Sequence, residues 1–227
     1  MRTAPIIAKM QHSYKDQLSG QAGVLNHKKV SRLAQEMTDA VNSLPCSGSN
    51  AMFVCVDKDR CDIIKVLITG VQHTPYASGC FEFDVFCPPD YPDVAPKFTL
   101  GTTGNGSIRF NPNLYSNGKV CLSLLGTWSG KGGETWSSSS TLLQVYASIQ
   151  SLIMTEDVYF NEPGYEESQG TEEGNRLNRG YCNIVRYGTL RYAILQQILT
   201  PSPAFENVIR FVLRSYAIKF MLTYFLH

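Results

Sequence analysis

An Asn-Pro-Asn turn stands shortly before a cysteine, and these two features together suit covalent acyl transfer. The turn is Asn111–Pro112–Asn113 and the cysteine is Cys121. A cysteine attacks a carbonyl as its thiolate, and a polar donor must then stabilise the oxyanion that forms. The amide of Asn113 offers such a donor, and Gly118 allows the intervening loop to fold back because glycine tolerates positive φ. Taken alone, these residues are equally consistent with a turn followed by a buried, inert cysteine.

The elements that must position these residues belong to one globular domain, or to one domain with an appended tail. The 227 residues are 43% hydrophobic, which is enough for a sizeable core. The 20 basic and 19 acidic residues give a net charge of +1. This balance offers no electrostatic case for binding nucleic acid or an anionic membrane.

Seven cysteines are scattered along the chain, and this odd number indicates a reducing compartment rather than a disulfide framework. No Cys-x-x-Cys pair occurs, and several cysteines lie in apolar, strand-like runs without histidine partners. These are Cys55, Cys61, Cys80 and Cys87. We interpret them as core residues and expect no metal site and no cofactor. A cytoplasmic location is expected, with the nucleus as the alternative, because Ile6–Ile7–Ala8 is too short for a secretory signal.

The N-terminal half is predicted to contain a lead-in, a helix and a sheet. Residues 1–26 are polar and lack a sustained period, so we expect a flexible lead-in. A helix is predicted over residues 27–44, with an apolar face made of Val30, Leu33, Met37, Val41 and Leu44. Strands are predicted at Met52–Val56, Asp62–Thr69, Cys80–Phe86 and Lys97–Leu100. Their short connections favour an antiparallel meander.

The C-terminal half is predicted to be helical. A core-facing helix is indicated by Leu142, Val145, Ile149, Leu152 and Ile153. After an exposed loop from Glu166 to Gly174, a helix over residues 178–199 is indicated by Ile184, Leu190, Ile194, Leu195 and Ile198. Residues 201–227 are expected to form a helical extension packed on the domain or on a partner. A membrane span is disfavoured because it needs about 20 largely apolar residues, and Arg210, Arg214 and Lys219 interrupt this segment.

The order of the motifs resembles the ubiquitin-conjugating (E2) family. Residues 75–86 lead into the proline-rich segment 88–96, and the turn, Cys121, Trp136 and a helix follow. The likeness implies an α+β ubiquitin-conjugating (UBC) fold, with an N-terminal helix, a four-stranded antiparallel meander, an active-site loop and C-terminal helices. The catalytic domain would be residues 27–200. Two segments, Val120–Trp128 and Tyr159–Glu166, resemble the large, atypical members of this family.

The resemblance implies that Cys121 carries ubiquitin as a thioester. Ubiquitin would arrive from a ubiquitin-activating enzyme and leave to a lysine of a protein substrate, so that one hard step becomes two easier ones. A cysteine protease would need a nearby base, whereas an incoming thioester is already reactive. No histidine shares a motif with Cys121; the four are His12, His27, His73 and His227. Their placement favours transfer over peptide hydrolysis.

The same resemblance assigns the other site residues. Asn113 matches the family asparagine credited with stabilising the oxyanion or with holding the loop beside the active site. Asn111 stands where the family usually has a histidine that fixes this loop, and Pro112 and Gly118 shape it. Glu162 falls where many members place an acidic residue that orients the incoming lysine and favours loss of its proton. A solvated loop glutamate is the alternative for that position.

The resemblance also indicates contacts with partners. Lys28, Lys29 and Arg32 match the family's contact with the activating enzyme, the alternative being a solvated basic end of the helix. Two positions of the usual ligase-docking surface are changed, because Asp93 replaces an apolar aromatic residue and Ser138 replaces a proline. Docking surfaces depend on a few apolar anchors. We therefore expect this domain not to rely on standard ligase docking, which agrees with an E2/E3 hybrid.

Three other functions stay open on the sequence alone. The first is a catalytically silent module of the same fold that binds ubiquitin or a partner, although such variants lack the cysteine. The second is a scaffold fragment of a giant protein that acts only with its other domains. The third is an E2 for another ubiquitin-like modifier, because neither the fold nor the cysteine motif encodes which modifier is loaded.

Overall fold

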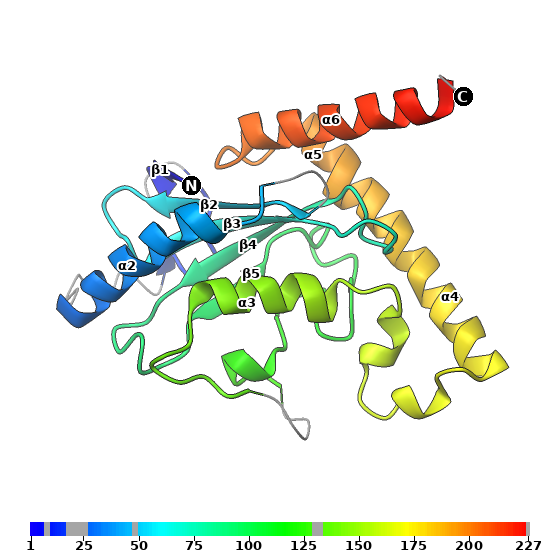
Figure 1. The fold of residues 1–227 in the computed structure, drawn as a ribbon, viewed down its shortest axis with the longest axis horizontal. Helices are drawn as coiled ribbons and strands as arrows, with labels where there is room; N and C mark the ends of the chain where they lie inside the picture. The colour runs from blue at the N-terminus through cyan, green and yellow to red at the C-terminus, as the bar shows by residue number, and fades with distance from the viewer. Residues whose placement is uncertain (7–9, 17–26, 47–49, 129–133, 226–227) are drawn as a thin grey trace.

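A computed structural model describes residues 1–6, 10–16, 27–46, 50–128 and 134–225. Its centre is a sheet whose strands follow one another in chain order: β1 (Arg2–Ala4), β2 (Met52–Asp57), β3 (Ile63–Thr69), β4 (Cys80–Phe86) and β5 (Lys97–Leu100). Helices α2 (His27–Ser43) and α3 (Leu142–Ser148) pack on one face, and the N-terminal segment and α6 (Glu206–Phe225) pack on the other (Figure 1). This α+β arrangement confirms the predicted fold class.

Strands β2 to β5 form the predicted antiparallel meander, and their ends agree with the prediction to within one residue. The sheet nevertheless has a fifth strand, because β1 pairs in parallel with β2 and places Arg2 beside Cys55. The sheet is therefore mixed, and the prediction of four strands was incomplete. A strand of three residues is too short to carry an alternating pattern that sequence analysis could detect.

The lead-in also differs from the expectation of a flexible segment. Ile6 is fully buried, and His12 and Tyr14 are 7% and 8% exposed. Residues 1–6 and 10–16 therefore lie against the domain. Isolated buried side chains hold them there, and such side chains give no regular apolar pattern in the sequence. Residues 7–9 and 17–26 lie outside the described part of the chain, and the expectation for them stays a prediction.

Strands β3 and β4 are buried along their whole length, because layers cover both faces of the sheet. Phe81, Phe83 and Val85 face the core that α2 and α3 complete. The alternate residues Cys80 and Phe86 lie on the other face, in a second core with the C-terminal segment. Fully burying one large apolar side chain contributes about 1.5–3 kcal/mol relative to exposing it.

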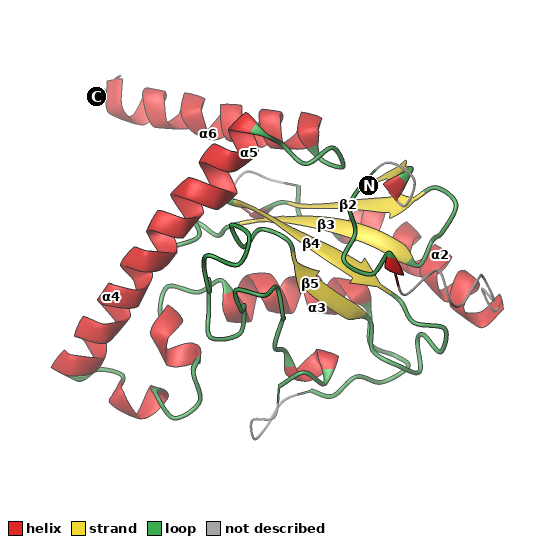
Figure 2. Cartoon of the chain, turned by 180° about the vertical axis from the view of Figure 1, so that it is seen from behind, coloured by secondary structure: helices red, strands yellow, loops and turns green. Residues whose placement is uncertain are grey.

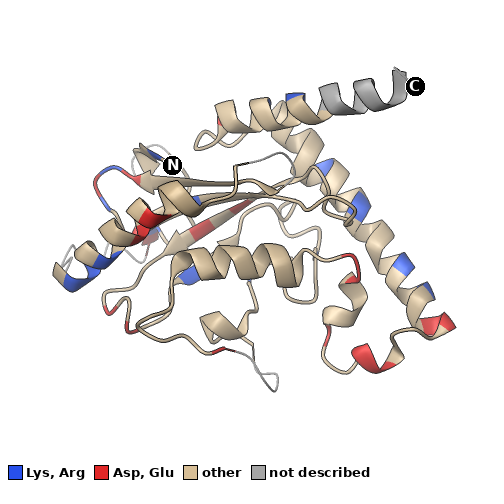
Figure 3. Cartoon of the chain, in the orientation of Figure 1, with Lys and Arg blue, Asp and Glu red and all other residues tan. Residues whose placement is uncertain are grey.

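Helix α2 forms where predicted, but its buried face is rotated from the predicted one. Leu33, Met37 and Leu44 are buried as expected, whereas Val30 and Val41 are 37% and 61% exposed. The buried face instead includes Lys29, Glu36 and Ala40. Basic and acidic residues both lie along α2 (Figure 3). Because Lys29 bonds the buried Asp62 and Glu36 bonds the buried Tyr91, apolar character alone mispredicted two positions of the buried face.

The helix after the cysteine begins at a capping box. Thr141 accepts a hydrogen bond from the Gln144 backbone, and the Gln144 side chain accepts one from the Thr141 backbone. The helix continues beyond α3 as a π-helical segment, Ile149–Ile153. Since this wider turn shifts the helical register, Leu152 is 62% exposed and not core-facing as predicted.

Helix α4 (Glu172–Gly188) begins six residues before the predicted start, so the exposed loop ends at its N-cap, Thr171. It continues through a π-helical segment, Thr189–Leu195, into α5 (Gln196–Leu199). The predicted apolar face was largely wrong, because four of its five residues are exposed: Ile184, Leu190, Leu195 and Ile198. Small residues face the domain instead. A Cβ on Gly188 would lie only 1.9 Å from Ile108 Cδ1, so the helix backbone approaches the domain closely at this glycine.

Helix α6 crosses the second face of the sheet, as both views of the fold make clear (Figures 1 and 2). Phe205, Ile209 and Val212 are buried there against the second core. The start of α6 therefore lies on the domain, which is one of the two placements expected for the tail. Across the described residues, no helix combines the length and the apolar character that crossing a membrane requires.

Candidate active site

The loop that carries Cys121 is fixed to the edge of the sheet at β5. The Leu100 backbone N–H donates to Gly118 O over 2.8 Å, and Thr99 forms a bridge with Lys119. Gly118 has φ of 88°, and a Cβ there would lie 2.7 Å from Leu100 O. Glycine is therefore required at this point by both its backbone conformation and its close approach to β5.

Asn111 lies at the centre of a buried hydrogen-bond network. It is fully buried, and its Nδ2 donates to Tyr76 Oη at 3.0 Å and to Ile153 O at 2.8 Å. Its Oδ1 accepts from the Asn113 backbone N–H at 2.9 Å. The Tyr76 hydroxyl in turn donates to Phe110 O, and burial raises the pKa of this phenol well above its usual value. Asn111 thus joins the turn to the helical segment after α3.

Asn113 and Cys121 bond to each other in both directions. Asn113 Nδ2 donates to Cys121 O at 3.1 Å, and the Cys121 backbone N–H donates to Asn113 O at 2.8 Å. Of the two roles that the family resemblance offers for Asn113, this geometry matches the holding of the loop. The same side chain remains adjacent to Cys121, whose thioester carbonyl would carry the oxyanion.

Cys121 is 6% exposed, and it is a free cysteine. In the described part of the chain its thiol has no hydrogen-bond partner. Thr127 holds the following turn, because its Oγ1 accepts from the Leu122 N–H at 3.0 Å and donates to Val120 O at 2.7 Å. Sequence analysis missed Thr127, since hydrogen bonds to backbone groups leave no spacing motif.

Arg109 connects Glu162 to the Asn-Pro-Asn turn. Its Nη2 donates to Pro112 O at 2.6 Å and lies 3.2 Å from Glu162 Oε2. Its guanidinium also lies 4.2 Å from the centroid of the Tyr115 ring. The Glu162 side chain is 37% exposed, so it faces the surface beside the turn. Arg109 was not predicted, although it is the residue that brings Glu162 and the active-site loop together.

A groove of about 400 Å³ continues from this pair towards α4. Pro112 and Glu162 line one end of it, and Tyr159 and Tyr165, which stack at 4.6 Å, line it further along. Tyr159 therefore forms part of the wall of this groove, whereas the neighbouring Phe160 does not. The site thus combines a nucleophile on a fixed loop with a carboxylate beside an aromatic groove.

The three residues expected to contact an activating enzyme have different environments. Lys28 is on the surface and pairs with Asp93. Lys29 is only 2% exposed and donates to Asp62 at 2.7 Å, so it offers no surface to a partner in this structure. Arg32 bonds Glu36 at 2.6 Å and Ser140 O at 2.6 Å, so it joins α2 to the start of α3.

The two changed docking positions, Asp93 and Ser138, are both exposed. Near them, Trp136 Nε1 donates to Pro92 O at 2.7 Å, which fixes the segment after the cysteine to the proline-rich loop. The surface at this point therefore presents a charge and a hydroxyl where sequence analysis expected them. Among the described residues, no three His, Cys, Asp or Glu side chains group so as to hold a metal ion.

A meander with helices on one face and a cysteine on a loop at the β5 edge defines the fold class of a ubiquitin-conjugating domain. Comparison with known families agrees, because the family model described as "Ubiquitin-conjugating enzyme" matches residues 32–186. The chain belongs to the ubiquitin-conjugating enzyme family.

The relatives of this chain differ widely in length. The chain is 50% identical over 202 residues to the human "Dual E2 ubiquitin-conjugating enzyme/E3 ubiquitin-protein ligase BIRC6", covering 88% of this chain and 4% of that protein. It is 50% identical over 181 residues to "Probable ubiquitin-conjugating enzyme protein 17" of Caenorhabditis elegans, covering 80% and 25%. It is 46% identical over 155 residues to human "Ubiquitin-conjugating enzyme E2 Z", covering 68% of this chain and 42% of that protein. The chain thus spans less than half of each.

Proposed function

We propose that this chain is an active ubiquitin-conjugating enzyme in which Cys121 carries ubiquitin as a thioester. One observation supports the proposal above the others. The reciprocal hydrogen bonds between Asn113 and Cys121 fix the nucleophile on its loop, while its thiol has no hydrogen-bond partner among the described residues. Such a thiol has no base to assist attack on a peptide bond, but it suits exchange with a thioester that is already reactive.

The reaction has two balanced steps. The Cys121 thiolate attacks the thioester carbonyl of ubiquitin on the activating enzyme, the new C–S bond forms, and the enzyme's cysteine leaves as a thiolate. A substrate lysine amine then attacks the new thioester, forms an isopeptide bond and releases the Cys121 thiol. The amine must lose a proton before or during this attack, and Glu162 is the carboxylate that lies beside the loop to accept it or to orient the amine.

The partners of this reaction are therefore ubiquitin, a ubiquitin-activating enzyme and protein substrates. Lys28 is the exposed member of the three basic residues on α2, so we assign the activating-enzyme contact mainly to it. The charged Asp93 and exposed Ser138 replace apolar docking anchors, which supports direct substrate transfer in the manner of an E2/E3 hybrid. The printed name of the human relative BIRC6 is in keeping with this. The free cysteines support a cytoplasmic or nuclear location.

A charging assay with activating enzyme, ATP and ubiquitin tests the proposal. The wild-type chain should form an adduct that reductant removes, Cys121→Ala should form none, and Cys121→Ser should form an adduct that resists reductant. Cys46→Ser is the matched control, because Cys46 is the exposed cysteine among the described residues and should leave charging unchanged. An adduct that survives Cys121→Ala but disappears in Cys46→Ser would contradict the assignment.

Two alternatives have distinct outcomes in the same assay. An E2 for another modifier would charge at Cys121 only when ubiquitin is replaced by a different ubiquitin-like protein and its activating enzyme. A silent binding module would charge with none of them and would bind ubiquitin non-covalently. The intact cysteine and its fixed loop favour the conjugating enzyme.

A further inference from the structure

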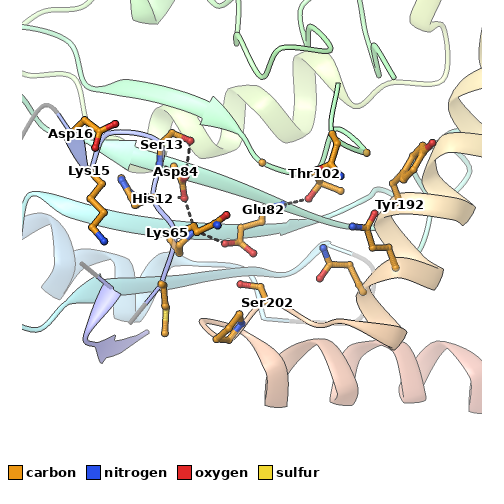
Figure 4. A pocket seen from close by; sticks show the side chains of 18 residues that line it. His12, Ser13, Lys15, Asp16, Lys65, Glu82, Asp84, Thr102, Tyr192 and Ser202 are labelled. Carbon is orange, nitrogen blue, oxygen red and sulfur yellow. Dashed lines mark hydrogen bonds and ion pairs between the residues drawn. The ribbon is translucent and has the colours of Figure 1, made fainter. Parts of the chain in front are cut away.

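A polar cavity of about 770 Å³ lies on the second face of the sheet (Figure 4), and none of the residues that line it belongs to the group around Cys121. Its wall is contributed by the N-terminal segment, by β3 and β4, by the loop after β5 and by the helical segment that leads to α6. The residues that matter below are Lys65, Glu82, Asp84, Thr102, Tyr192 and Gln196. Its volume falls within the range of about 300–1,000 Å³ that small-molecule sites occupy.

The floor of the cavity is a buried ion cluster. Lys65 Nζ donates to Glu82 Oε1 at 2.7 Å and to Asp84 Oδ1 at 2.6 Å. Asp84 Oδ2 accepts from both the backbone N–H and the hydroxyl of Ser13, at 2.7 and 2.8 Å. Burial alone would lower the pKa of Lys65, but the two carboxylates outweigh it and raise that pKa. Both oxygens of the Asp84 carboxylate thus accept hydrogen bonds from groups of the chain itself.

Only one of the two oxygens of the Glu82 carboxylate accepts a hydrogen bond from a described residue. Its Oε1 accepts from Lys65, but among the described residues its Oε2 has no hydrogen-bond partner and is not sealed from the cavity. The side chain is 11% exposed and lines the cavity. The Glu82 backbone N–H donates to Thr102 Oγ1 at 3.0 Å, which fixes the backbone position from which this side chain extends. A preoriented acceptor therefore faces the open space.

Among the described residues that line it, the cavity carries one negative charge in excess. Lys65 supplies one positive charge against the two carboxylates of Glu82 and Asp84. His12 does not compensate, because its Nε2 bonds Ile64 O and its Nδ1 accepts from the Tyr14 N–H, which is the pattern of a neutral imidazole. At the rim, Lys15 and Asp16 cancel each other in formal charge. An uncompensated charge in a partly desolvated site is costly, and a bound cation would offset that cost.

We infer that this cavity is a binding site for a ligand bearing a guanidinium or primary ammonium group, which donates to Glu82 Oε2. Tyr192 lines the same space (Figure 4). Gln196 lines it too, and both side chains would contact the body of the ligand. The cavity is larger than a lone ammonium needs, so the ligand is a cation attached to several further heavy atoms. The group comes from a free amine or from a lysine or arginine side chain of a partner protein.

The site is separate from the conjugation chemistry, because no residue that lines it belongs to the group around Cys121. Binding can therefore be measured on the full chain carrying Cys121→Ala, and its result does not depend on thioester formation. The probes are N-acetyl-arginine methylamide, spermidine and, as the neutral isostere, N-acetyl-citrulline methylamide. Isothermal titration or NMR chemical-shift titration gives each dissociation constant.

We expect the arginine amide, spermidine or both to bind, and the citrulline amide to bind at least about tenfold more weakly, as loss of a charge-assisted hydrogen bond requires. Binding of the arginine amide alone assigns the site to a protein side chain, and binding of spermidine alone assigns it to a free amine. Failure of both cations to bind, or equal binding of the citrulline amide, would overturn the inference.

A pair of charge variants at Gln196 tests the cavity itself. This side chain lines the cavity but is exposed on α5, so substitution there should leave the fold intact. Q196K should weaken cation binding about threefold to tenfold and Q196E should strengthen it, because each places a charge at the wall. Glu82→Gln should abolish binding, with thermal unfolding to check that the variant is folded. Equal affinities in Q196K and Q196E would place the ligand elsewhere and overturn the assignment.

Discussion

Asn113 and Cys121, eight positions apart in the active-site loop, hold each other through one side-chain hydrogen bond and one backbone hydrogen bond. The amide of Asn113 therefore fixes the carbonyl of the very residue whose thiol would carry ubiquitin. Its position also leaves it as the adjacent donor when the tetrahedral intermediate forms. The two roles of this asparagine can be separated by measuring stability and transfer in the same variant.

Asn113→Ala should slow discharge of charged ubiquitin to free lysine on the order of 100-fold, as loss of one oxyanion donor does. It should lower the free energy of unfolding by only about 1 kcal/mol, the net value of one hydrogen bond. Single-turnover discharge and denaturant unfolding measure the two effects. The control is Asn117→Ala, which removes a bond to the Lys119 N–H in the same loop. Equal slowing by both variants would reduce Asn113 to a structural residue.

Glu162→Gln should slow discharge to lysine by about tenfold or more while leaving charging unchanged, because the carboxylate would act on the incoming amine and not on the thioester exchange. The 3.2 Å contact with Arg109 holds the side chain near the turn, and glutamine preserves its shape. Glu167→Gln is the matched control, since Glu167 is an exposed carboxylate in the same loop region. Slower charging in Glu162→Gln would place this residue in contact with the activating enzyme instead.

Asn111→Ala should be severely destabilising. It would remove three hydrogen bonds from a fully buried position. Tyr76 Oη would keep its bond to Phe110 O and Ile153 O its bond from the Thr155 N–H, whereas the Asn113 N–H would lose its partner among the described residues. Each buried polar group left unsatisfied costs about 1–3 kcal/mol. Thermal or denaturant unfolding measures the loss.

Asn111→His is the informative companion to that alanine variant, because the family usually has histidine at this position. A ring that recovers even one of these bonds should restore part of the stability. If Asn111→Ala unfolds like the wild-type chain, the network contributes little and the loop must be held by other contacts.

How far the sequence predicted this structure depends on the range of the interactions involved. Strands β2 to β5 were found because alternation and turn residues are local signals, whereas β1 was missed because three residues hold no period. Along α4 and the π-helical segment that follows it, the large apolar residues Ile184 and Leu190 face outward, whereas Gly188 lies against Ile108 of the domain. Helix position is thus a local property, but the face a helix buries is set by its neighbours.

The same contrast applies to the candidate site. Cys121, Asn113 and Glu162 were proposed from motifs, because residue type and spacing recur wherever that chemistry does. Arg109 and Thr127 act by bonding backbone carbonyls of residues nearby in space, and such bonds impose no residue pattern. The burial of Lys29 was likewise missed, because its partner Asp62 lies 33 residues further along the chain.

Stability should fall in acid through Asp62 and Asp84. Burial alone would raise the pKa of Asp62, but Arg60 and Lys29 outweigh it and hold that pKa below its usual range. The pKa of Asp84 is also lowered, because the charge of Lys65 and the hydrogen bonds from Lys65 and Ser13 outweigh the effect of burial. Since the folded values lie below the unfolded value of about 3.9, this stabilisation is complete above that pH and is lost as the pH falls through the folded values.

Asp62→Asn checks this pH dependence directly. It removes the buried carboxylate that Lys29 and Arg60 share, so it should cost about 3–5 kcal/mol at neutral pH, as breaking a buried pair does. Because the variant has no carboxylate to protonate at this position, its stability should fall less than that of the wild-type chain between pH 5 and 2. Parallel acid dependence in the two proteins, measured by urea unfolding, would show that Asp62 is not the group responsible.

Ordinary RING-type ligase domains should not stimulate discharge from this chain. Their usual docking surface needs an apolar aromatic residue and a proline, and here Asp93 is exposed and paired with Lys28 while Ser138 is exposed. An exposed pair of this kind contributes only about 0–1 kcal/mol, so the main obstacle is the missing apolar anchor. The double variant Asp93→Phe, Ser138→Pro should therefore gain stimulation by a RING domain that leaves the wild-type chain unaffected. Lysine discharge measured over a panel of RING domains tests this, and robust stimulation of the wild-type chain would refute it.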